Sequence, residues 1–502
     1  MKPDLNDDAV RDAVLCPEKL VFVEAGPGTG KTTVAVERFG VYRFKRIRPG
    51  GGGVRMLAFT RAVTAELRRR IRARWGDGAL SGDLGSVSTI DGDFHRVLEF
   101  LRANDLIGWP GSPPAVIPVN SWSDVDGVAK YNYGKWQNDT YRVALVDGKV
   151  VAISDQKAGP GERYIGKTVL ANALKDGICT HDDVRNIVME ATQPGTAAAD
   201  AVVAWLRGRV AHLIVDEVFD ADEGDLALID LYRRADARIT VIGDPWQALY
   251  EWRQSVPATV RSALIASEFT ELTLQTSRRF EGSMVSMTNT LRGSPTLLPP
   301  VCPAEHKPNV VLAQTWRQLW DLPDWVLPLA FQGRLSTITG AFVTLFVDEL
   351  AQLHLGQASP LRAEAVRMVF QNDDTVGRLT TEFAPVREAL LQAPEDGLAA
   401  LRATHLGGRQ PSALATDGEA ALLQLMANIA RRLRHTDTFT MGLSVHQAKG
   451  CEWEHVGAYL DARDRSALAN GLDQDNAHDR MVYVALTRAK HTTVLVEPPL
   501  NT

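Results

Sequence analysis

Residues 21–33 read VFVEAGPGTGKTT, and this stretch decides how the chain begins to fold. An apolar, β-branched run ends at Glu24, a glycine-rich turn follows, and VAVERF continues the chain with a helical pattern. Strand, turn and helix in this order are the setting of a P-loop. Gly26, Gly28 and Gly30 let the backbone curl so that its N–H groups face phosphate oxygens, and the helix adds its positive N-terminal end.

Two side chains of this stretch have chemistry of their own. Lys31 is expected to reach the outer phosphates of a nucleotide, and Thr32 to hold Mg²⁺ through its hydroxyl. A glycine turn with a chance lysine is the plain alternative, and the strand and helix on either side argue against it. The predicted nucleotide pocket comprises Gly26, Pro27, Gly28, Thr29, Gly30, Lys31, Thr32 and Thr33.

Length and composition describe a globular chain of several domains. It has 502 residues, 45% of them hydrophobic, and a net charge of −6, so a nucleic-acid partner would need a locally positive groove. The four cysteines are scattered without a CxxC pair, which fits the reducing cytoplasm and predicts no zinc site. We find no signal peptide and no apolar run long enough to span a bilayer, and expect no membrane partner.

Two further strands predict a parallel α/β sheet. Residues 54–60 form an apolar strand followed by an arginine-rich helix, and residues 212–217 form a strand that ends in Asp216 and Glu217. Strand–helix alternation favours parallel pairing, with ligands at the carboxyl ends of the strands. Two carboxylates at the end of a buried strand are costly without a cation. We therefore expect Asp216 to hold Mg²⁺ and Glu217 to polarise an attacking water.

The predicted strand at 239–242 leads into GDPWQALYEWR, residues 243–253. Gln247 follows the strand end and can reach the γ-phosphate or the attacking water. Tyr250 and Trp252 can present their rings to bases, and such stacking contributes about 1–3 kcal/mol per base. Taken alone, the two aromatics are more often core residues.

Between residues 98 and 203 the sheet pattern stops, which predicts an inserted subdomain. Alternation over 141–146 and 149–153, around Asp147-Gly148, predicts a β-hairpin. The subdomain is dense in aromatic residues, which either stack bases or, as we favour, build a small core. They are Trp109, Trp122, Tyr131, Tyr133, Trp136 and Tyr141.

Together these motifs make the chain similar to superfamily 1 DNA helicases of the UvrD/Rep/PcrA type. Eight stretches resemble the motifs of that family, occur in the same order and run from end to end of the chain. They are AGPGTGKT (25–32), AFTRAVTAELRRRI (58–71), STIDGDFH (88–95), VDEVFD (215–220), GDPWQALYEWR (243–253), LQTSRRF (274–280), VHQAKGCEW (445–453) and YVALTRAK (483–490).

The resemblance implies a role for each matching residue. Lys31, Thr32, Asp216 and Glu217 keep the roles given above, and Gln247 senses the γ-phosphate. The residues that match contacts to single-stranded DNA are Phe59, Thr60, Arg61, Thr89, Tyr250, Trp252 and His446.

Four residues of the second half complete the implied nucleotide site. Arg279 and Arg488 match the two arginine fingers of the family, and a finger contributes about 10³–10⁵ in rate by stabilising transition-state charge. Glu452 matches a glutamate near the ribose. Arg278 replaces a base-stacking tyrosine, and its planar guanidinium can stack instead.

The sequence also departs from the family. The adenine-reading glutamine of the family falls near Val10, and the segment LNDDAVRDAV has none, so we expect relaxed selectivity for adenine. Phe219, Asp91 and the pair Arg61-Ala62 stand where the family has other residues. These three departures bear on coupling to DNA and not on hydrolysis.

The second half continues the α/β pattern, with predicted strands at 309–312 and 366–370 and a predicted helix at 337–353. We predict an α/β fold with two RecA-like parallel-sheet motor domains, an inserted subdomain 1B with a β-hairpin and a small helical subdomain 2B. The predicted boundaries are 1–97 and 206–277 for motor domain 1A, 98–205 for 1B, 278–383 and 439–502 for motor domain 2A, and 384–438 for 2B.

The function implied by the resemblance is an ATP-dependent 3′→5′ translocase and helicase on single-stranded and partial duplex DNA, with Mg²⁺ as cofactor and other NTPs as further substrates. The alternative is an NTP-dependent DNA-sensing motor subunit of a nuclease or anti-phage defence complex, which unwinds little alone. A nuclease or a repair protein is the expected protein partner, in the cytoplasm. A P-loop kinase or GTPase, the third interpretation, does not predict arginines at 279 and 488.

Overall fold

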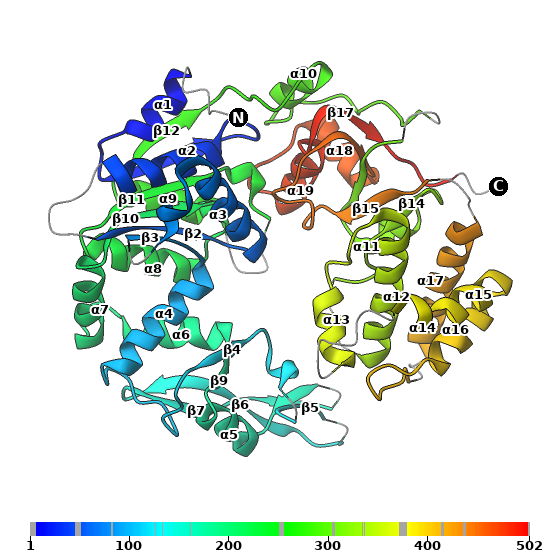
Figure 1. Cartoon of the computed structure of the whole chain (residues 1–502), viewed down its shortest axis with the longest axis horizontal. Helices are drawn as coiled ribbons and strands as arrows, with labels where there is room; N and C mark the ends of the chain where they lie inside the picture. The colour runs from blue at the N-terminus through cyan, green and yellow to red at the C-terminus, as the bar shows by residue number, and fades with distance from the viewer. Residues whose placement is uncertain are drawn as a thin grey trace. The chain divides into compact units, whose positions relative to one another are not determined.

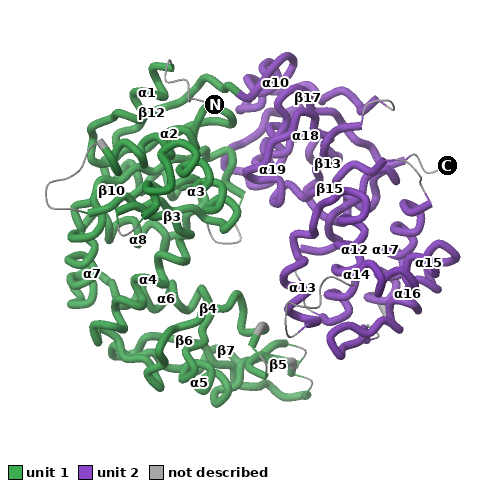
Figure 2. Tube along the Cα trace, viewed as in Figure 1, with its two compact units in different colours: residues 1–278 green, residues 279–502 purple. Residues whose placement is uncertain are grey.

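The computed structural model describes residues 7–45, 52–81, 84–125, 127–132, 134–160, 162–249, 256–303, 307–333, 335, 337–370, 379–412, 416–434 and 438–499. The chain divides into two compact units, residues 1–278 and residues 279–502 (Figure 2). We call them unit 1 and unit 2.

Unit 1 is built on a six-stranded sheet with the strand order β12-β1-β11-β10-β2-β3 (Figure 1). All five pairings are parallel. Consequently the loops that follow β1, β10 and β11 leave from one edge of the sheet. The strands are β1 (Leu20–Ala25), β2 (Gly53–Ala58), β3 (Gly85–Thr89), β10 (Val210–Asp216), β11 (Arg238–Gly243) and β12 (Thr270–Leu274).

Helices cover this sheet because their apolar residues recur at helical spacing. In α4, Phe94, Val97, Leu98 and Leu101 are all buried, so one face of that helix packs into the core. α6 begins with a capping box between Thr180 and Asp183, which satisfies the first N–H groups of that helix. The helices of unit 1 other than α5 are α1 (Asp8–Leu15), α2 (Lys31–Gly40), α3 (Arg61–Trp75), α4 (Ile90–Ala103), α6 (His181–Ala191), α7 (Ala197–Arg207), α8 (Glu223–Arg234) and α9 (Pro257–Ala266).

The insertion of unit 1 contains the predicted β-hairpin. β6 (Asn138–Val146) and β7 (Lys149–Ala158) pair antiparallel, and the two turn residues between them have positive φ, as a type I′ turn requires. Trp109 and Trp122 are buried in a core that is continuous with the sheet, whereas Trp136 is 85% exposed. The remaining elements of the insertion are β4 (Ile117–Val119), β5 (Ala129–Tyr131), β8 (Arg163–Ile165), α5 (Lys167–Lys175) and β9 (Ile178–Thr180).

A buried polar network connects strand β2 of the sheet to helices α4 and α8. The Asp93 carboxylate has no exposed surface and accepts hydrogen bonds from Arg55 Nη1 and from the Tyr232 hydroxyl, both at 2.5 Å. Burial, followed by the nearby Asp93 charge, raises the pKa of Tyr232 well above its usual value, so the hydroxyl stays protonated and donates.

Replacing Asp93 with alanine should lower the free energy of unfolding of unit 1 by about 3–5 kcal/mol, because it leaves the Arg55 charge buried without its partner. Denaturant unfolding followed by circular dichroism measures the loss. Asp230→Ala is the control, since Asp230 pairs with Arg233 at the surface and should change stability by about 1 kcal/mol or less. Equal loss in both variants would contradict the structural role of Asp93.

Unit 2 has its own sheet, of five strands in the order β14-β15-β13-β16-β17, and all four pairings are parallel. Two parallel sheets, one with a hairpin-bearing insertion and one with a helical insertion, confirm the predicted α/β fold with two RecA-like domains. The strands are β13 (Val310–Ala313), β14 (Val326–Pro328), β15 (Thr440–Ser444), β16 (Trp453–Ala458) and β17 (Ala489–Leu495).

The central helix of unit 2 corrects one expectation. By length and composition α12 (Ile338–Leu355) is apolar enough to cross a membrane, although no such run was expected from the sequence. In the structure 67% of it is buried inside the protein, and its buried Asp348 and Glu349 pair with Arg362 and Arg387. Among the described residues, α12 therefore has the packing of a core helix.

Residues 366–370 are not the predicted strand. They lie largely in α13 (Arg362–Val369), whose Ala365, Val366 and Val369 are buried together. Valines favour strands by propensity, but the spacing of these three residues is helical, and packing against α12 decides the outcome. The prediction failed because a five-residue apolar run does not distinguish the two periods.

Helices form the insertion of unit 2 between β14 and β15. Arg432 of α17 has no exposed surface, and its guanidinium donates to the backbone carbonyls of Leu319, Trp320, Leu322, Val326 and Asn428. This arginine thereby fixes α17 to the segment before β14. The helices of unit 2 besides α12 and α13 are α10 (Ser283–Thr290), α11 (Trp316–Trp320), α14 (Leu379–Glu382), α15 (Ala384–Gln392), α16 (Pro394–Ala403), α17 (Thr416–Arg434), α18 (Ala462–Asn470) and α19 (Ala477–Leu486).

Candidate nucleotide-binding site

The P-loop, residues 25–32, joins the end of β1 to the start of α2. Gly28 and Gly30 have φ of 73° and 106°, a region that residues with a Cβ rarely adopt, so glycine is needed at both positions. Gly30 is the N-cap of α2 and contributes no side-chain hydrogen bond to the first turn. The N–H groups of that turn are consequently available to a phosphate.

Lys31 lies over the loop that it follows. Its Nζ donates to the carbonyl of Ala25 at 3.2 Å and lies 4.0 Å from Glu217 Oε1. The Thr29 hydroxyl donates to the Gly26 carbonyl at 2.9 Å and holds the loop in its curled form. Thr32 and Thr33, both half-buried, occupy the first turn of α2, and Pro27 is buried in the loop.

The carboxylates predicted at the end of β10 lie at the same edge. Asp216 is 4% exposed, and its Oδ1 accepts from the backbone N–H of Glu217 at 3.1 Å. Glu217 has a φ of 58°, a left-handed conformation that costs a residue with a side chain about 1–3 kcal/mol. This turn aims the Glu217 carboxylate toward Lys31, which is why the strain is consistent with a functional position.

Gln247 lies in the short 3₁₀ turn Pro245–Gln247 after β11 and is buried. Its Nε2 donates to Asp244 Oδ2 at 2.9 Å, and Asp244 Oδ1 accepts from the N–H of Trp246 at 3.1 Å. Asp244 thus orients Gln247, a role that the sequence reading missed. The signal was present, since an aspartate before proline is a common turn start.

Two residues that follow β12 hold the P-loop in place by hydrogen bonds to its backbone. Ser277 Oγ donates to the Pro27 carbonyl at 2.8 Å, and the backbone N–H of Arg278 donates to the Gly28 carbonyl at 3.0 Å. The Arg278 guanidinium lies 3.2 Å from Asp7 Oδ2. Asp7 also caps α1 and is a second residue that the sequence reading missed, because nothing local links it to residue 278.

Glu24 is a further acidic group at this edge, at the end of β1. It pairs with Arg261 of α9. Burial raises the pKa of the Glu24 carboxyl, against the opposite effect of the Arg261 hydrogen bond and charge. We read this pair as structural, because the arginine neutralises the carboxylate.

Unit 2 brings together three residues predicted from three separate motifs. Arg279 Nη2 donates to Glu452 Oε1 at 2.7 Å, and Arg279 Nη1 donates to the carbonyl of Thr487 at 3.1 Å. Arg488 is 2% exposed and donates from Nε to the carbonyl of Val484 at 3.2 Å. Arg279, Glu452 and Arg488 therefore form one cluster at β16 and the end of α19.

The residues predicted to contact DNA have mixed positions. Thr60 follows β2 and Thr89 ends β3, and their hydroxyl oxygens cap α3 and α4. Arg61 is exposed in the first turn of α3, whereas Phe59 belongs to the hydrophobic core and has little ring surface for a base. His446 is partly exposed in the turn after β15. Tyr250 and Trp252 lie outside the described residues.

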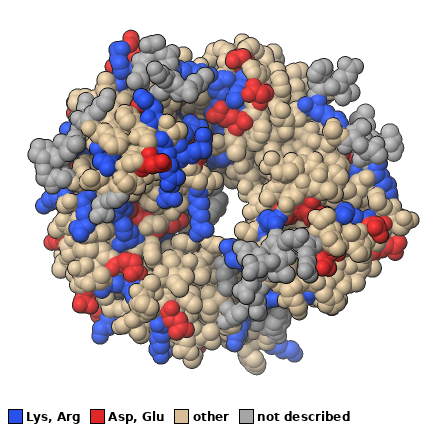
Figure 3. All heavy atoms as spheres, viewed as in Figure 1, with Lys and Arg blue, Asp and Glu red and all other residues tan. Residues whose placement is uncertain are grey.

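Lys and Arg side chains gather on the face of unit 1 that carries α2 and α3 (Figure 3). Part of this charge is neutralised locally, since Glu66 accepts hydrogen bonds from Arg69 and Arg70. These hydrogen bonds lower the pKa of Glu66 to about 2, so it remains ionised at neutral pH. Arg68 donates to the carbonyl of Val87. The face is positive although the chain as a whole is acidic.

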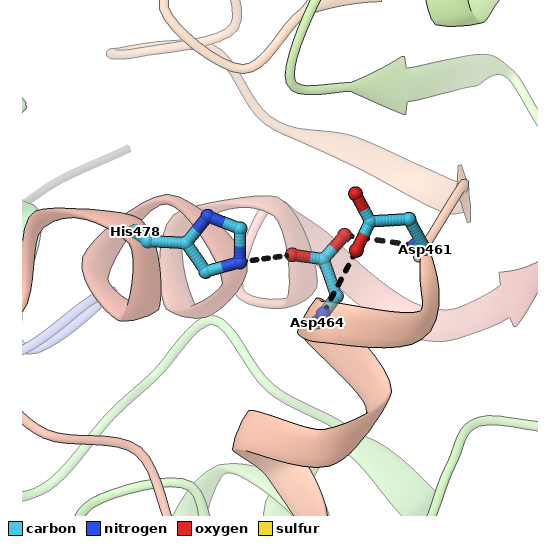
Figure 4. A group of neighbouring side chains, drawn as sticks. All are labelled: Asp461, Asp464 and His478. Atoms are coloured by element: carbon cyan, nitrogen blue, oxygen red, sulfur yellow. Dashed lines mark hydrogen bonds and ion pairs between the residues drawn. The ribbon is translucent and has the colours of Figure 1, made fainter.

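Asp461, Asp464 and His478 could be taken for a metal site, because ligand atoms of all three lie within 4.8 Å of one another (Figure 4). Both carboxylate oxygens of Asp464 and Oδ1 of Asp461 already accept hydrogen bonds, however. Asp461 and Asp464 form the capping box of α18, and Asp464 Oδ1 lies 2.8 Å from His478 Nε2. Burial raises the pKa of Asp464. The group clasps α18 to α19, and we assign it a structural role.

Fold and loop geometry define unit 1 as a parallel α/β domain with a P-loop at the carboxyl edge of its sheet. Residues 7–253 match the family model of the AAA domain, so the match includes α1, the P-loop and the carboxylates of β10. A search of curated proteins found no match.

Two solved helicase structures are distantly similar to the chain. One is arterivirus nonstructural protein 10, a helicase in complex with DNA, at 12% identity and a TM-score of 0.30, covering 98% of this chain and 63% of that one. The other is the Pif1 helicase from Candida albicans, at 12% identity and a TM-score of 0.40, covering 98% and 94%. The chain thus spans 63% of the length of the arterivirus chain. The fold is therefore assigned from the two parallel sheets and the P-loop of this chain, and not from these two structures.

Proposed function

We propose that the chain hydrolyses ATP to move along single-stranded DNA and to unwind duplex DNA in the 3′→5′ direction. The observation that carries the proposal is the convergence of Lys31, Glu217 and Gln247 at the edge of the unit 1 sheet where the P-loop lies. The match of residues 7–253 to the AAA domain supports nucleotide binding at that edge. The proposed polarity rests on the resemblance of residues 445–453 to the family motif.

In this proposal each residue of the pocket has its own task. The backbone of the P-loop and the Lys31 ammonium bind the β- and γ-phosphates. The Thr32 hydroxyl and the Asp216 carboxylate are the kind of oxygen ligands that Mg²⁺ prefers, and the bound ion supplies positive charge next to the phosphates. Glu217 orients the attacking water and takes its proton, and Asp244 holds Gln247 beside it.

We assign to Arg279 and Arg488 the stabilisation of charge on the transferred phosphoryl group. Glu452 holds the Arg279 guanidinium by a 2.7 Å hydrogen bond, and the side chain of Arg279 is mostly buried. An arginine fixed by a carboxylate loses little conformational entropy when it engages a phosphate. For the DNA strand we propose contacts to Arg61 and the positive face at α3.

Single-stranded DNA should raise the rate of ATP hydrolysis, and the stimulation should weaken as salt increases, because phosphate contacts release counterions. The measurement is kcat with and without a thymidine oligonucleotide over a series of salt concentrations. If DNA leaves hydrolysis unchanged at low salt, the translocase proposal fails.

Strand displacement separates the proposal from its alternative, a DNA-sensing subunit that acts with a nuclease or a repair protein. The isolated chain should displace a labelled strand from a duplex with a 3′ single-stranded tail, and should fail on a 5′ tail. DNA-stimulated hydrolysis without displacement on either substrate would favour the sensing subunit instead.

Selectivity between purine nucleotides should be weak. Where the family carries an adenine-reading glutamine, the chain presents Val10, and its side chain faces Gly30 of the P-loop. Arg278, paired with Asp7, offers a planar surface that stacks on any base. The kcat/KM values for ATP and GTP should lie within about tenfold, or 1.4 kcal/mol, of each other. A preference for ATP of about a hundredfold or more would show a base-reading contact that this interpretation lacks.

A further inference from the structure

Unit 2 contains a cavity of about 760 Å³ between α11, α12 and α17. That volume lies in the range of sites for small molecules. Its walls are mainly apolar and aromatic, and no residue of the proposed hydrolysis site lines it. The lining residues that matter here are Trp320, Phe331, Gln332, Val343, Leu425 and Asn428.

Two amide side chains in this cavity have unused hydrogen-bonding groups. Asn428 is 7% exposed, and its amide makes no hydrogen bond to any residue that the structure describes. Gln332 Nε2 is buried and has no partner within the described part of the chain. A buried amide N–H without a partner costs about 1–3 kcal/mol, so Gln332 Nε2 calls for a ligand or water, and the Asn428 amide in the cavity wall is free to bind the same ligand.

The other inner polar group is already committed. The Thr339 hydroxyl donates to the carbonyl of Ser412 at 2.9 Å and accepts from its N–H at 3.1 Å. The charged lining residues, Arg317 and Asp321, are exposed and lie at the mouth. A ligand that fits this interior is therefore uncharged, flat enough to lie along aromatic walls, and carries a donor and an acceptor side by side.

We propose that this cavity is a binding site for a nucleobase, bound as a nucleoside. A carboxamide pairs bidentately with the adjacent donor and acceptor on the edge of a base, as Asn and Gln do with adenine. Phe331 and Trp320 line the wall against which the base packs, and Trp320 is held there by the Arg432 guanidinium, 4.9 Å from its ring centroid. The ribose then extends to the mouth, where Arg317 and Asp321 are exposed.

The site is built so that binding stabilises unit 2. Asn428 and Leu425 belong to α17, and Val343 belongs to α12. A ligand held by both helices adds contacts between them, next to the carbonyls that Arg432 already holds. Ligand binding should therefore raise the melting temperature of the chain.

Adenosine is the probe, because without phosphates it leaves the phosphate-binding groups of the P-loop unused. Calorimetric titration of the full chain should show binding, and Asn428→Leu should weaken it about tenfold or more, since a bidentate pair contributes about 1–3 kcal/mol. N6,N6-dimethyladenosine, which lacks the N6–H donors, should bind the unchanged protein about tenfold more weakly than adenosine. Asn470→Leu, on the exposed end of α18, is the matched control and should bind as the unchanged protein does.

Photolabelling tests the site in the unchanged protein, so the result does not depend on whether a variant folds. Irradiation of the unchanged protein with 8-azidoadenosine should label peptides that contain residues 317–343 and 418–428. Labelling confined to unit 1, or adenosine binding that is unaffected by Asn428→Leu, would overturn the proposal. So would equal affinity for the dimethylated analogue. None of these outcomes depends on whether the chain hydrolyses ATP.

Discussion

Lys31→Ala is expected to lower kcat for ATP hydrolysis by about a hundredfold to a thousandfold, the usual effect of removing one preorganised donor from developing negative charge. The Lys31 ammonium lies at the P-loop, where we propose that the phosphates bind. Its Nζ donates to the Ala25 carbonyl at 3.2 Å and lies 4.0 Å from Glu217 Oε1. Steady-state phosphate release by the full chain with saturating Mg–ATP measures the loss.

Lys19→Ala is the matched control. Lys19 precedes β1 in the same unit and forms a surface ion pair with Asp236. Its removal should leave hydrolysis unchanged, and circular dichroism should show the same fold for both variants. If Lys31→Ala hydrolyses ATP at the rate of Lys19→Ala, the P-loop is not a hydrolytic site.

Glu217→Gln should have an effect of similar size, about 10²–10⁴-fold in kcat, because it removes the base that accepts the proton of the attacking water. The change is nearly isosteric and keeps the left-handed backbone at this position, so nucleotide binding should persist. Single-turnover hydrolysis and titration with a fluorescent ATP analogue separate the two quantities.

Glu223→Gln serves as the control for this variant. Glu223 lies in the first turn of α8, in the same unit, and is exposed. It should hydrolyse ATP at the unchanged rate. Loss of ATP binding together with hydrolysis in Glu217→Gln would instead indicate that Glu217 positions Lys31, and a residue other than Glu217 would then be the base.

The local parts of the site could be predicted because short-range rules determine them. Positive φ at Gly28 and Gly30 follows from a turn that only glycine adopts without strain, and the strand of Asp216 and Glu217 is a plain apolar run. The hairpin around Asp147 follows from the same turn chemistry. Each of these signals acts within a few residues.

The predictions that failed or stayed incomplete depend on packing. A short valine-containing run became part of α13, because its apolar residues face α12. Phe59 directly follows β2 and is buried in the hydrophobic core. Its position in a motif therefore did not predict how little of its ring is exposed. The sequence of α12 did not predict the ion pairs that its Asp348 and Glu349 make inside unit 2.

The sequence by itself determined the P-loop turn, the strands that precede it and the Asp216-Glu217 pair, and which residue types stand at those strand ends. Only the tertiary structure decided which of them meet. The Arg279–Glu452 hydrogen bond joins residues 173 positions apart in the sequence. The ion pair of Asp7 with Arg278 joins residues from the two ends of the unit 1 sequence. The physical reason is that propensity and turn chemistry act on neighbours along the chain, whereas such pairs exist only after parallel strands have paired and buried the core around them.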